Sequence, residues 1–364
     1  MKAQHWIKIW LSIISLALLV GLVNYTVDPN GFNRMIEIPG FNKIKASKSD
    51  SMPIQYKMPR LREGGWDNLM MGTSSIGVMD NNVISKYLDG RTFNLSQPAS
   101  AMPVQFDSFM YAVHYNNIKN VVYAVDFISF NKNRKLNADY IQLKDKLRSL
   151  DSFYTYNIYF NKDTLVKSLK LVWQNYKGKI TPSARYMSNG QRVYQNYLYE
   201  HERGEFDVQK KMDGVSHFLL NENGYYENYT YSPMYMDEFK KIVRYCKDNN
   251  INLYVYISPL YKDFLVHLAR AGLLDEFMHF KQELANVTDY IDFTGNNALM
   301  SNINNFWDPL HLRVENTSIV MDDVFNEQRN TLKFATYMSK TNIRENLKKQ
   351  SFEYKDYNLS ATVK

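Results

Sequence analysis

Cysteine is nearly absent from this 364-residue sequence, in which Cys246 stands alone. One cysteine excludes a disulfide within the chain, and nothing near it has the spacing of metal ligands. The histidines show no mutual spacing typical of a metal site, and the sequence contains no nucleic-acid-binding motif. We therefore expect no metal, no other cofactor and no nucleic-acid partner.

Acidic residues are fewer than basic ones: 37 Asp and Glu stand against 44 Lys and Arg, which gives a net charge of +7. An excess of this sign suits anionic lipid headgroups or an anionic cell-wall polymer. Because the basic residues are scattered along the chain, an ordinary solvated surface explains the excess equally well. A hydrophobic content of 45% with 22% charged residues is that of a globular protein and argues against disorder.

The amino terminus carries a long apolar segment. It runs from Trp6 to Val27, begins among the basic residues Lys2 and Lys8, and is long enough to span a bilayer. A cleaved signal peptide is the alternative, but no small-x-small cleavage site follows Val23. We expect residues 1–28 to form an uncleaved single-pass anchor in the cell membrane, with a cytoplasmic amino terminus and the rest of the chain extracytoplasmic.

The rest of the chain divides by composition. Residues 29–66 contain four prolines and a Lys/Ser-rich piece, and we expect them to form a stalk. Residues 67–330 carry the periodic elements of one globular domain, in which 131–231 is a long aromatic-rich insertion. Residues 331–364 are polar and basic and form a tail without a motif.

Short apolar runs alternate with helical patterns along the globular domain. Strands are predicted for the run that ends at Met71 and for Thr92–Leu95, Asn120–Val125, Leu253–Ile257 and Tyr290–Phe293. Helices are predicted for Met102–His114, Leu165–Tyr176, Met234–Asn249, Phe264–Ala271 and Phe277–Val287. This alternation predicts an α/β fold, a three-layer sandwich in which helices cover both faces of a five-stranded parallel sheet. In such sheets ligands bind outside the carboxyl ends of the strands.

A glycine and a hydroxyl cluster, Gly72-Thr73-Ser74-Ser75, follow the first predicted strand. We interpret Ser74 as a nucleophile, although by itself a serine there could also cap the helix that follows. A nucleophilic serine needs a histidine base and an orienting carboxylate. Asp308-Pro-Leu-His311 supplies both beyond the last predicted strand, at a spacing that lets one short turn hold the carboxylate against the imidazole.

With these motifs the chain resembles the SGNH hydrolase superfamily, over about residues 68–326 with the insertion excluded. Gly72-Thr73-Ser74 resembles the first family block, Gly-Asp-Ser, with Thr73 in place of the Asp. Asp308 and His311 match the last block, Asp-x-x-His. The stretch 93–100 resembles the second block and has Ala99 where the family glycine stands. The resemblance implies that 67–330 is an SGNH-like catalytic domain with Ser74, Asp308 and His311 as its triad.

The third family block, Gly-x-Asn-Asp, should follow the third strand, where this chain has Val125-Asp126-Phe127-Ile128-Ser129. The asparagine that serves as an oxyanion donor in the family is therefore missing, and loss of such a donor costs about 3 kcal/mol of transition-state stabilisation. This argues against fast hydrolysis more than against acyl transfer. Asp126 and the backbone N–H of Ala99 remain our candidates for oxyanion or substrate contacts.

The resemblance is strongest to the membrane-anchored, extracytoplasmic branch of the superfamily, the DltD-like proteins and the SGNH partners of membrane-bound O-acyltransferases. It implies addition or removal of O-acetyl groups on a cell-surface polysaccharide through an acyl-enzyme, with a membrane-bound O-acyltransferase as partner. D-alanyl transfer to teichoic acid and a non-catalytic polysaccharide-binding or scaffold role are the alternatives. Tyrosines in the insertion, such as Tyr194, Tyr197 and Tyr226, either stack on sugar rings or serve as packing.

Overall fold

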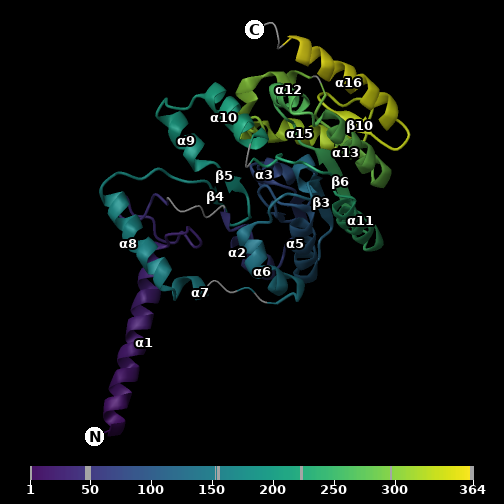
Figure 1. The fold of residues 1–364 in the computed structure, drawn as a ribbon. Coiled ribbons are helices and arrows are strands. Elements are labelled where there is room, and N and C mark those ends of the chain that lie inside the picture. Colours follow the sequence, from purple (N-terminus) through teal and green to yellow (C-terminus); the bar gives the residue numbers. More distant parts are fainter. Residues whose placement is uncertain are drawn as a thin grey trace.

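The protein has an α/β fold around a central six-stranded sheet (Figure 1). The computed structural model describes residues 2–45, 51–151, 153, 156–221, 224–295 and 297–360. In order across the sheet the strands are β10 (Thr336–Met338), β7 (Tyr290–Asp292), β6 (Asn252–Ile257), β3 (Asn120–Ala124), β1 (Asn68–Met71) and β2 (Thr92–Asn94). The strands β2, β1, β3, β6 and β7 are parallel, and their order reverses between β1 and β3. In doubly wound sheets such a reversal marks the place where ligands bind.

The count of five strands was wrong, because β10 adds a sixth to the edge of the sheet. Thr336 pairs with Asp292 and Met338 with Tyr290, both antiparallel. β10 lies within residues 331–364, which the sequence presented as a polar tail without a motif. Three residues, half-buried to buried, are too few to show the periodicity that predicts a strand. They form a strand because they pair with β7. The last four residues of that tail lie outside the described residues.

Both faces of the sheet are buried. Along β1 and β3 the side chains alternate: Leu69 and Val121 belong to the larger hydrophobic core, whereas Met70 and Val122 belong to a second core on the opposite face. The larger core is closed by α2 (Pro53–Arg62), α5 (Met102–Tyr115), α11 (Pro233–Asp248), α12 (Lys262–Arg270) and α13 (Leu274–Val287). The second is closed by α3 (Ser74–Gly77), α4 (Asn81–Ile84), α14 (Ala298–Ser301) and α15 (Thr317–Val324). Burial on both faces explains why the parallel strands read as continuous apolar runs.

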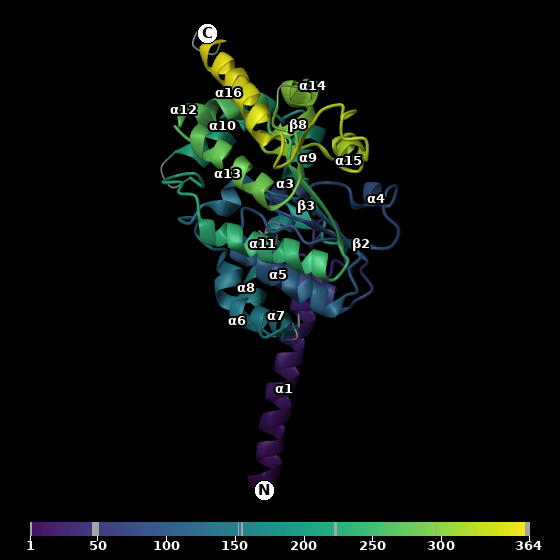
Figure 2. The same cartoon turned by 90° about the vertical axis from the view of Figure 1, so that its right-hand side faces the viewer.

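The segment from 131 to 231 leaves the sheet after β3 and returns before α11. An isolated antiparallel bridge joins Asn131 to Tyr231, so the two ends of the segment lie side by side. Between them are α6 (Ala138–Arg148), α7 (Tyr156–Tyr159), α8 (Lys162–Tyr176), β4 (Arg185–Tyr186), β5 (Arg192–Val193), α9 (Gln195–Glu202) and α10 (Val208–Leu220). Figures 1 and 2 show that α8 lies next to the end of α1, whereas α10 lies near the opposite end of the molecule.

The amino-terminal helix α1 (Lys2–Val27) projects from the globular part (Figures 1 and 2). By length and composition it is apolar enough to cross a membrane or to act as a signal sequence. The stalk predicted for 29–66 includes α2, whose Ile54, Met58 and Leu61 are completely buried in the larger core. The carboxyl-terminal helix α16 (Ile343–Ser360) packs on α12 and α13.

Candidate active site

Ser74 lies just beyond β1, at the first residue of α3. Between the strand and the helix, Gly72 has a backbone φ of +139°, a conformation that residues with a side chain rarely adopt. A Cβ atom at this position would lie 2.3 Å from the backbone carbonyl oxygen of Ala124 in β3. Glycine therefore lets the chain turn sharply against β3, and Ser74 is left half-buried at the carboxyl edge of the sheet.

Asp308 and His311 face each other across a hairpin formed by β8 (Phe306–Asp308) and β9 (His311–Leu312). Nδ1 of His311 lies 2.6 and 2.8 Å from the two carboxylate oxygens of Asp308. Nε2 of the same ring lies 2.7 Å from Oγ of Ser74. The three residues predicted as a triad thus form one hydrogen-bonded array, although Ser74 and His311 are 237 positions apart in the sequence.

The carboxylate of Asp308 is held by further hydrogen bonds in a buried site. The backbone N–H of Leu310 donates to it at 3.0 Å, and the hydroxyl of Tyr197 donates at 3.3 Å. Burial by itself would raise the pKa of Asp308, but the neighbouring His311 and these hydrogen bonds together lower it below its usual value. An ionised Asp308 keeps the imidazole proton on Nδ1, so that Nε2 is free to accept the proton of a serine hydroxyl.

Asp126, at the carboxyl end of β3, lies on the other side of the Ser74 turn. Its carboxylate accepts hydrogen bonds from the Thr73 hydroxyl at 2.6 Å, the Thr73 backbone N–H at 3.3 Å and the Ser75 hydroxyl at 2.9 Å. Burial raises the pKa of Asp126, while the hydrogen bonds from Thr73 and Ser75 lower it. Because an ionised carboxylate only accepts hydrogen bonds, Asp126 in that form holds the Ser74 turn and cannot donate to an oxyanion. Contact with a substrate group stays a prediction.

Ala99 lies in the loop after β2 and has a φ of +49°. This left-handed conformation favours glycine. The carbonyl oxygen of Ala99 accepts a hydrogen bond from Nε of Arg134 at 3.0 Å. Ala99 lies outside the set of residues that line the cavity beside Ser74. A backbone N–H of Ala99 that stabilises an oxyanion therefore stays a prediction.

A small cavity of about 30 Å³ opens beside Ser74. Its polar wall consists of Thr73, Ser74, Ser75, Asp126 and Ser258. Its apolar wall consists of Phe127, Ile128, Tyr226, Ile257, Leu260, Leu268, Phe277 and Leu310. A water-sized group needs roughly 10–15 Å³ by this measure, so the cavity accepts a group of a few non-hydrogen atoms.

Three tyrosines of the insertion surround the array, and the sequence did not predict this role for them. The ring of Tyr194 meets that of His311 edge to face at a centroid distance of 5.0 Å, and Tyr197 donates to Asp308. Tyr226 lines the cavity and stacks on Phe127 at 5.8 Å. The dense run of tyrosines in the sequence indicates that the segment is aromatic. It does not indicate which residue each ring contacts.

In the part of the chain that the structure describes, no group of three or more His, Cys, Asp or Glu is placed to hold a metal ion. Comparison of the chain with family models and with curated protein sequences finds no match. The class of protein is therefore described from its fold and its site alone. It is an α/β protein with a hydrogen-bonded Ser–His–Asp array at the carboxyl edge of a mostly parallel sheet.

Proposed function

We propose that this chain is an extracytoplasmic serine O-acyltransferase or esterase of the SGNH type, which adds or removes O-acetyl groups on a cell-surface polysaccharide. The observation that supports this most is the array in which His311 bridges Asp308 and Ser74 with distances of 2.6 and 2.7 Å. These are the contacts that a serine nucleophile needs. An array this well aligned also argues against a purely structural scaffold.

In the proposed reaction Nε2 of His311 takes the proton of Ser74, and Oγ attacks the acyl carbonyl carbon. Asp308 stabilises the imidazolium that forms. The tetrahedral intermediate collapses as His311 returns the proton to the leaving oxygen, which leaves an acyl group esterified to Ser74. A polysaccharide hydroxyl or a water molecule then attacks this ester, and His311 acts as the base again.

The size of the cavity favours acetyl over longer acyl groups. About 30 Å³ beside Ser74 has room for a methyl group and a carbonyl oxygen, and the apolar walls suit the methyl group. A chain of four or more carbons needs more room than this, and the cavity wall includes Phe277, which is 1% exposed and packed in the larger core.

D-alanyl transfer to teichoic acid is the second candidate, and Asp126 is the observation that favours it. A D-alanyl group carries an ammonium, which a carboxylate on the cavity wall would pair with. The hydroxyls of Thr73 and Ser75 weaken this case, because their hydrogen bonds already occupy the carboxylate of Asp126. We therefore rank O-acetyl chemistry first.

The setting of the reaction follows from α1. If α1 is an uncleaved anchor with its basic end in the cytoplasm, the array lies outside the membrane, where cell-surface polymers are found. An acyl group made inside the cell then has to cross the bilayer. A multi-pass O-acyltransferase is the partner that would deliver it.

The test uses the full chain in detergent micelles with a fluorophosphonate probe and aryl esters of acetate, butyrate and octanoate. Wild type should be labelled and should turn over acetate fastest, whereas Ser74→Ala should do neither. Ser85→Ala is the matched control, since it removes an exposed hydroxyl at the end of α4 that does not line the cavity, and it should still be labelled. A folded wild-type protein that is neither labelled nor active would contradict catalysis by this chain, and a preference for a D-alanyl ester that Asp126→Asn abolishes would favour the second candidate.

A further inference from the structure

Helix α8 exposes a stripe of large apolar side chains. Val166, Leu169, Trp173 and Tyr176 are 65, 61, 59 and 76% exposed. Their spacing of three, four and three residues places them on one face of the helix. The buried residues Thr164, Ser168, Leu171 and Asn175 form the opposite face. A helix on the surface of a soluble domain normally carries polar residues where α8 carries this stripe, so the stripe indicates a partner.

Basic residues accompany the stripe. Between residues 162 and 179 the sequence has five lysines and one aspartate. Lys162, Lys167, Lys170 and Lys177 are exposed, and Lys177 lies over the ring of Tyr176 at 5.6 Å. A helix with Trp, Tyr and Leu on one face and lysines beside them has the composition of helices that lie in the interfacial zone of a membrane.

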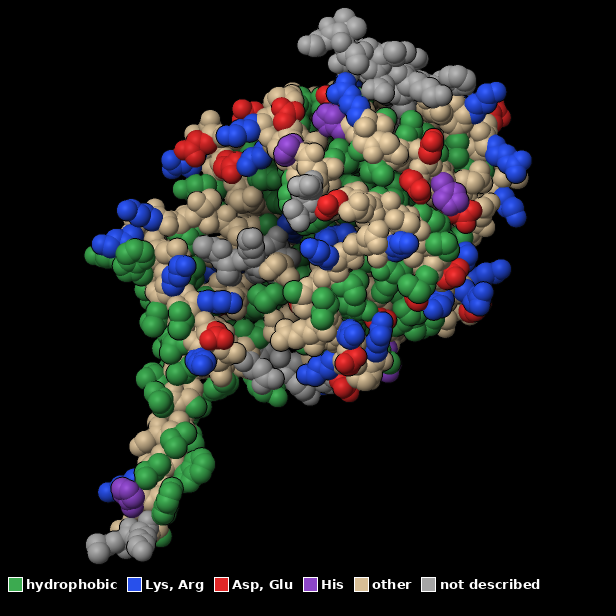
Figure 3. Space-filling model, in the orientation of Figure 1, with side chains coloured by type: hydrophobic (Ala, Val, Ile, Leu, Met, Phe, Trp, Pro, Cys, Tyr) green, Lys and Arg blue, Asp and Glu red, His purple; other side chains and the backbone are tan. Residues whose placement is uncertain are grey.

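The position of α8 points to the same partner. Asn24 in the last turns of α1 accepts a hydrogen bond from the hydroxyl of Ser168 in α8 at 2.9 Å, and Leu171 packs with Val27. Figure 3 shows apolar side chains along α1 and on the adjoining part of the globular domain, with basic side chains among them. Helix α8 thus packs on the end of the apolar helix α1 through the face opposite the stripe, and the stripe faces outward beside that end.

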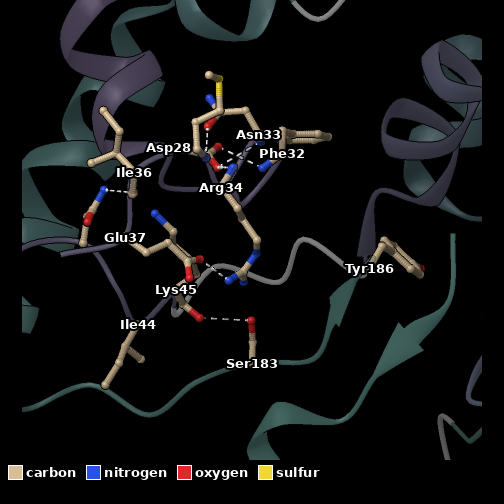
Figure 4. Close-up of polar contacts among 12 residues, drawn as sticks. Asp28, Phe32, Asn33, Arg34, Ile36, Glu37, Ile44, Lys45, Ser183 and Tyr186 are labelled. Carbon is tan, nitrogen blue, oxygen red and sulfur yellow. Dashed lines mark hydrogen bonds and ion pairs between the residues drawn. The ribbon is translucent and has the colours of Figure 1, made fainter. Parts of the chain in front are cut away.

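The joint between α1 and the globular domain is fixed by hydrogen bonds (Figure 4). The carboxylate of Asp28 accepts from the backbone N–H groups of Phe32, Asn33 and Arg34 at 2.8 to 3.0 Å. The buried ammonium group of Lys45 donates to the carbonyl of Val27 at 2.7 Å. Asn24 donates to the carbonyls of Tyr159 and Asn161 just before α8, and the backbone N–H of Ile44 donates to Asn175 in α8, so that α8 is held at one height relative to α1.

The position of α8 along α1 matches the surface of a bilayer that α1 would span. The apolar part of α1 has 25 residues, which at about 1.5 Å each extend about 37 Å. The hydrocarbon core is about 30 Å thick, so the end of the helix lies in the headgroup region, where α8 packs on it. We propose that α8 is a membrane-surface helix, whose apolar stripe enters the outer edge of an anionic leaflet while its lysines contact the headgroups. This rests on α1 being the anchor and is independent of the reaction at Ser74.

The test places a nitroxide label on the full chain reconstituted alone into vesicles of mixed phosphatidylglycerol and phosphatidylcholine. Leu169→Cys and Trp173→Cys are labelled in a Cys246→Ala background, because Cys246 is the only native cysteine. Met234→Cys is the control: Met234 is apolar and 64% exposed, and it lies in α11, on the other side of the globular part from α8 (Figure 1). The accessibility of each label to oxygen and to a water-soluble nickel complex is measured.

We expect the labels at 169 and 173 to be reached by oxygen and shielded from nickel, and the label at 234 to be reached by nickel. Vesicles of phosphatidylcholine alone should reduce the shielding at 169 and 173. Labels at 169 and 173 that are as open to nickel as the label at 234 would overturn the proposal. So would shielding that arises only when a multi-pass membrane protein is reconstituted with the chain, because the stripe would then dock on protein. Fluorophosphonate labelling of Ser74 is followed separately and does not enter this outcome.

Discussion

The hydroxyl of Tyr197 offers a direct test of how Asp308 is held. Tyr197→Phe removes one of the donors to this buried carboxylate and keeps the ring that packs near Trp307. Hydrogen bonds to charged groups contribute about 1.5–3 kcal/mol to stability, and the distance of 3.3 Å places this one at the lower end. We therefore expect Tyr197→Phe to lower the free energy of unfolding by about 1.5 kcal/mol at neutral pH.

This loss should depend on pH in a defined direction. The pKa of Asp308 in the folded protein lies below its ordinary value of 3.8, against the effect of burial, because of His311 and the hydrogen bonds it accepts. A depressed acid contributes stability above the unfolded pKa and loses it as the pH falls through the folded pKa. The difference between wild type and Tyr197→Phe should therefore be constant from pH 7 to about 5 and shrink only as the pH falls through the folded pKa of Asp308, which lies below 3.8.

Urea unfolding followed by fluorescence between pH 3 and 7 measures this difference, with Tyr199→Phe on the same helix as the control. Probe labelling at Ser74 should fall less than about threefold in Tyr197→Phe, because Asp308 stays ionised at neutral pH. Asp308→Asn should lose roughly 10⁴-fold, the size of effect seen when a triad carboxylate is neutralised. A Tyr197→Phe protein as stable as wild type at pH 7 would refute the hydrogen bond to the carboxylate. Labelling as slow as in Asp308→Asn would mean that Tyr197 takes part in the reaction.

Three further predictions concern the fold around the site. Gly72→Ala should lower the free energy of unfolding in urea by more than about 2 kcal/mol, because its Cβ would lie 2.3 Å from a β3 carbonyl. The control is Gly214→Ala in α10, whose Cβ would meet nothing within 4 Å and which should not destabilise the protein. Equal effects of the two substitutions would contradict the tight turn at Gly72. Burial raises the pKa of Asp139 from 3.8 to about 6, a difference worth about 3 kcal/mol, so this group destabilises the fold as the pH rises from 4 to 6. Asp139→Asn should flatten that part of the stability profile, and an unchanged profile would count against the shift. Lys281 and Asp292 form a completely buried ion pair at 2.9 Å, so Lys281→Met should lose about 3–5 kcal/mol. Lys240→Met, which removes an exposed pair with Asp237, should lose less than about 1 kcal/mol, and equal losses would refute the role of the buried pair.

The parallel strands could be predicted from sequence because buried strands consist of apolar residues, which the local composition shows. Asn120–Ala124 is buried at every position and therefore reads as a continuous apolar, β-branched run. The edge strand β10 is only three residues long and partly buried, and its pairing with β7 depends on contacts that no local pattern records.

The candidate site was predictable where spacing alone fixes geometry. Asp308 and His311 lie three apart, and a short hairpin brings them face to face. The role of Asp126 was not predictable, because Thr73 and Ser75 reach it only once β1 and β3 are paired. Likewise, Tyr194 and Tyr197 meet the array through an insertion whose path over the domain is set by tertiary packing.

The insertion links the end of α1 to the candidate site through fixed contacts. After α8 the chain forms the β4–β5 hairpin, in which the carbonyl of Asn189 accepts a hydrogen bond from the backbone N–H of Asn94 at 2.8 Å. Gly190 lies so close to Asn94 that a Cβ would be 2.2 Å from its carbonyl oxygen, and Tyr194 follows against His311. If α8 rests on lipid, this chain of contacts sets the distance of Ser74 from the bilayer. A soluble acyl donor would gain nothing from a fixed distance, whereas a donor embedded in the same membrane needs one, and this is the physical reason to pair the proposed acyl transfer with a membrane-bound partner.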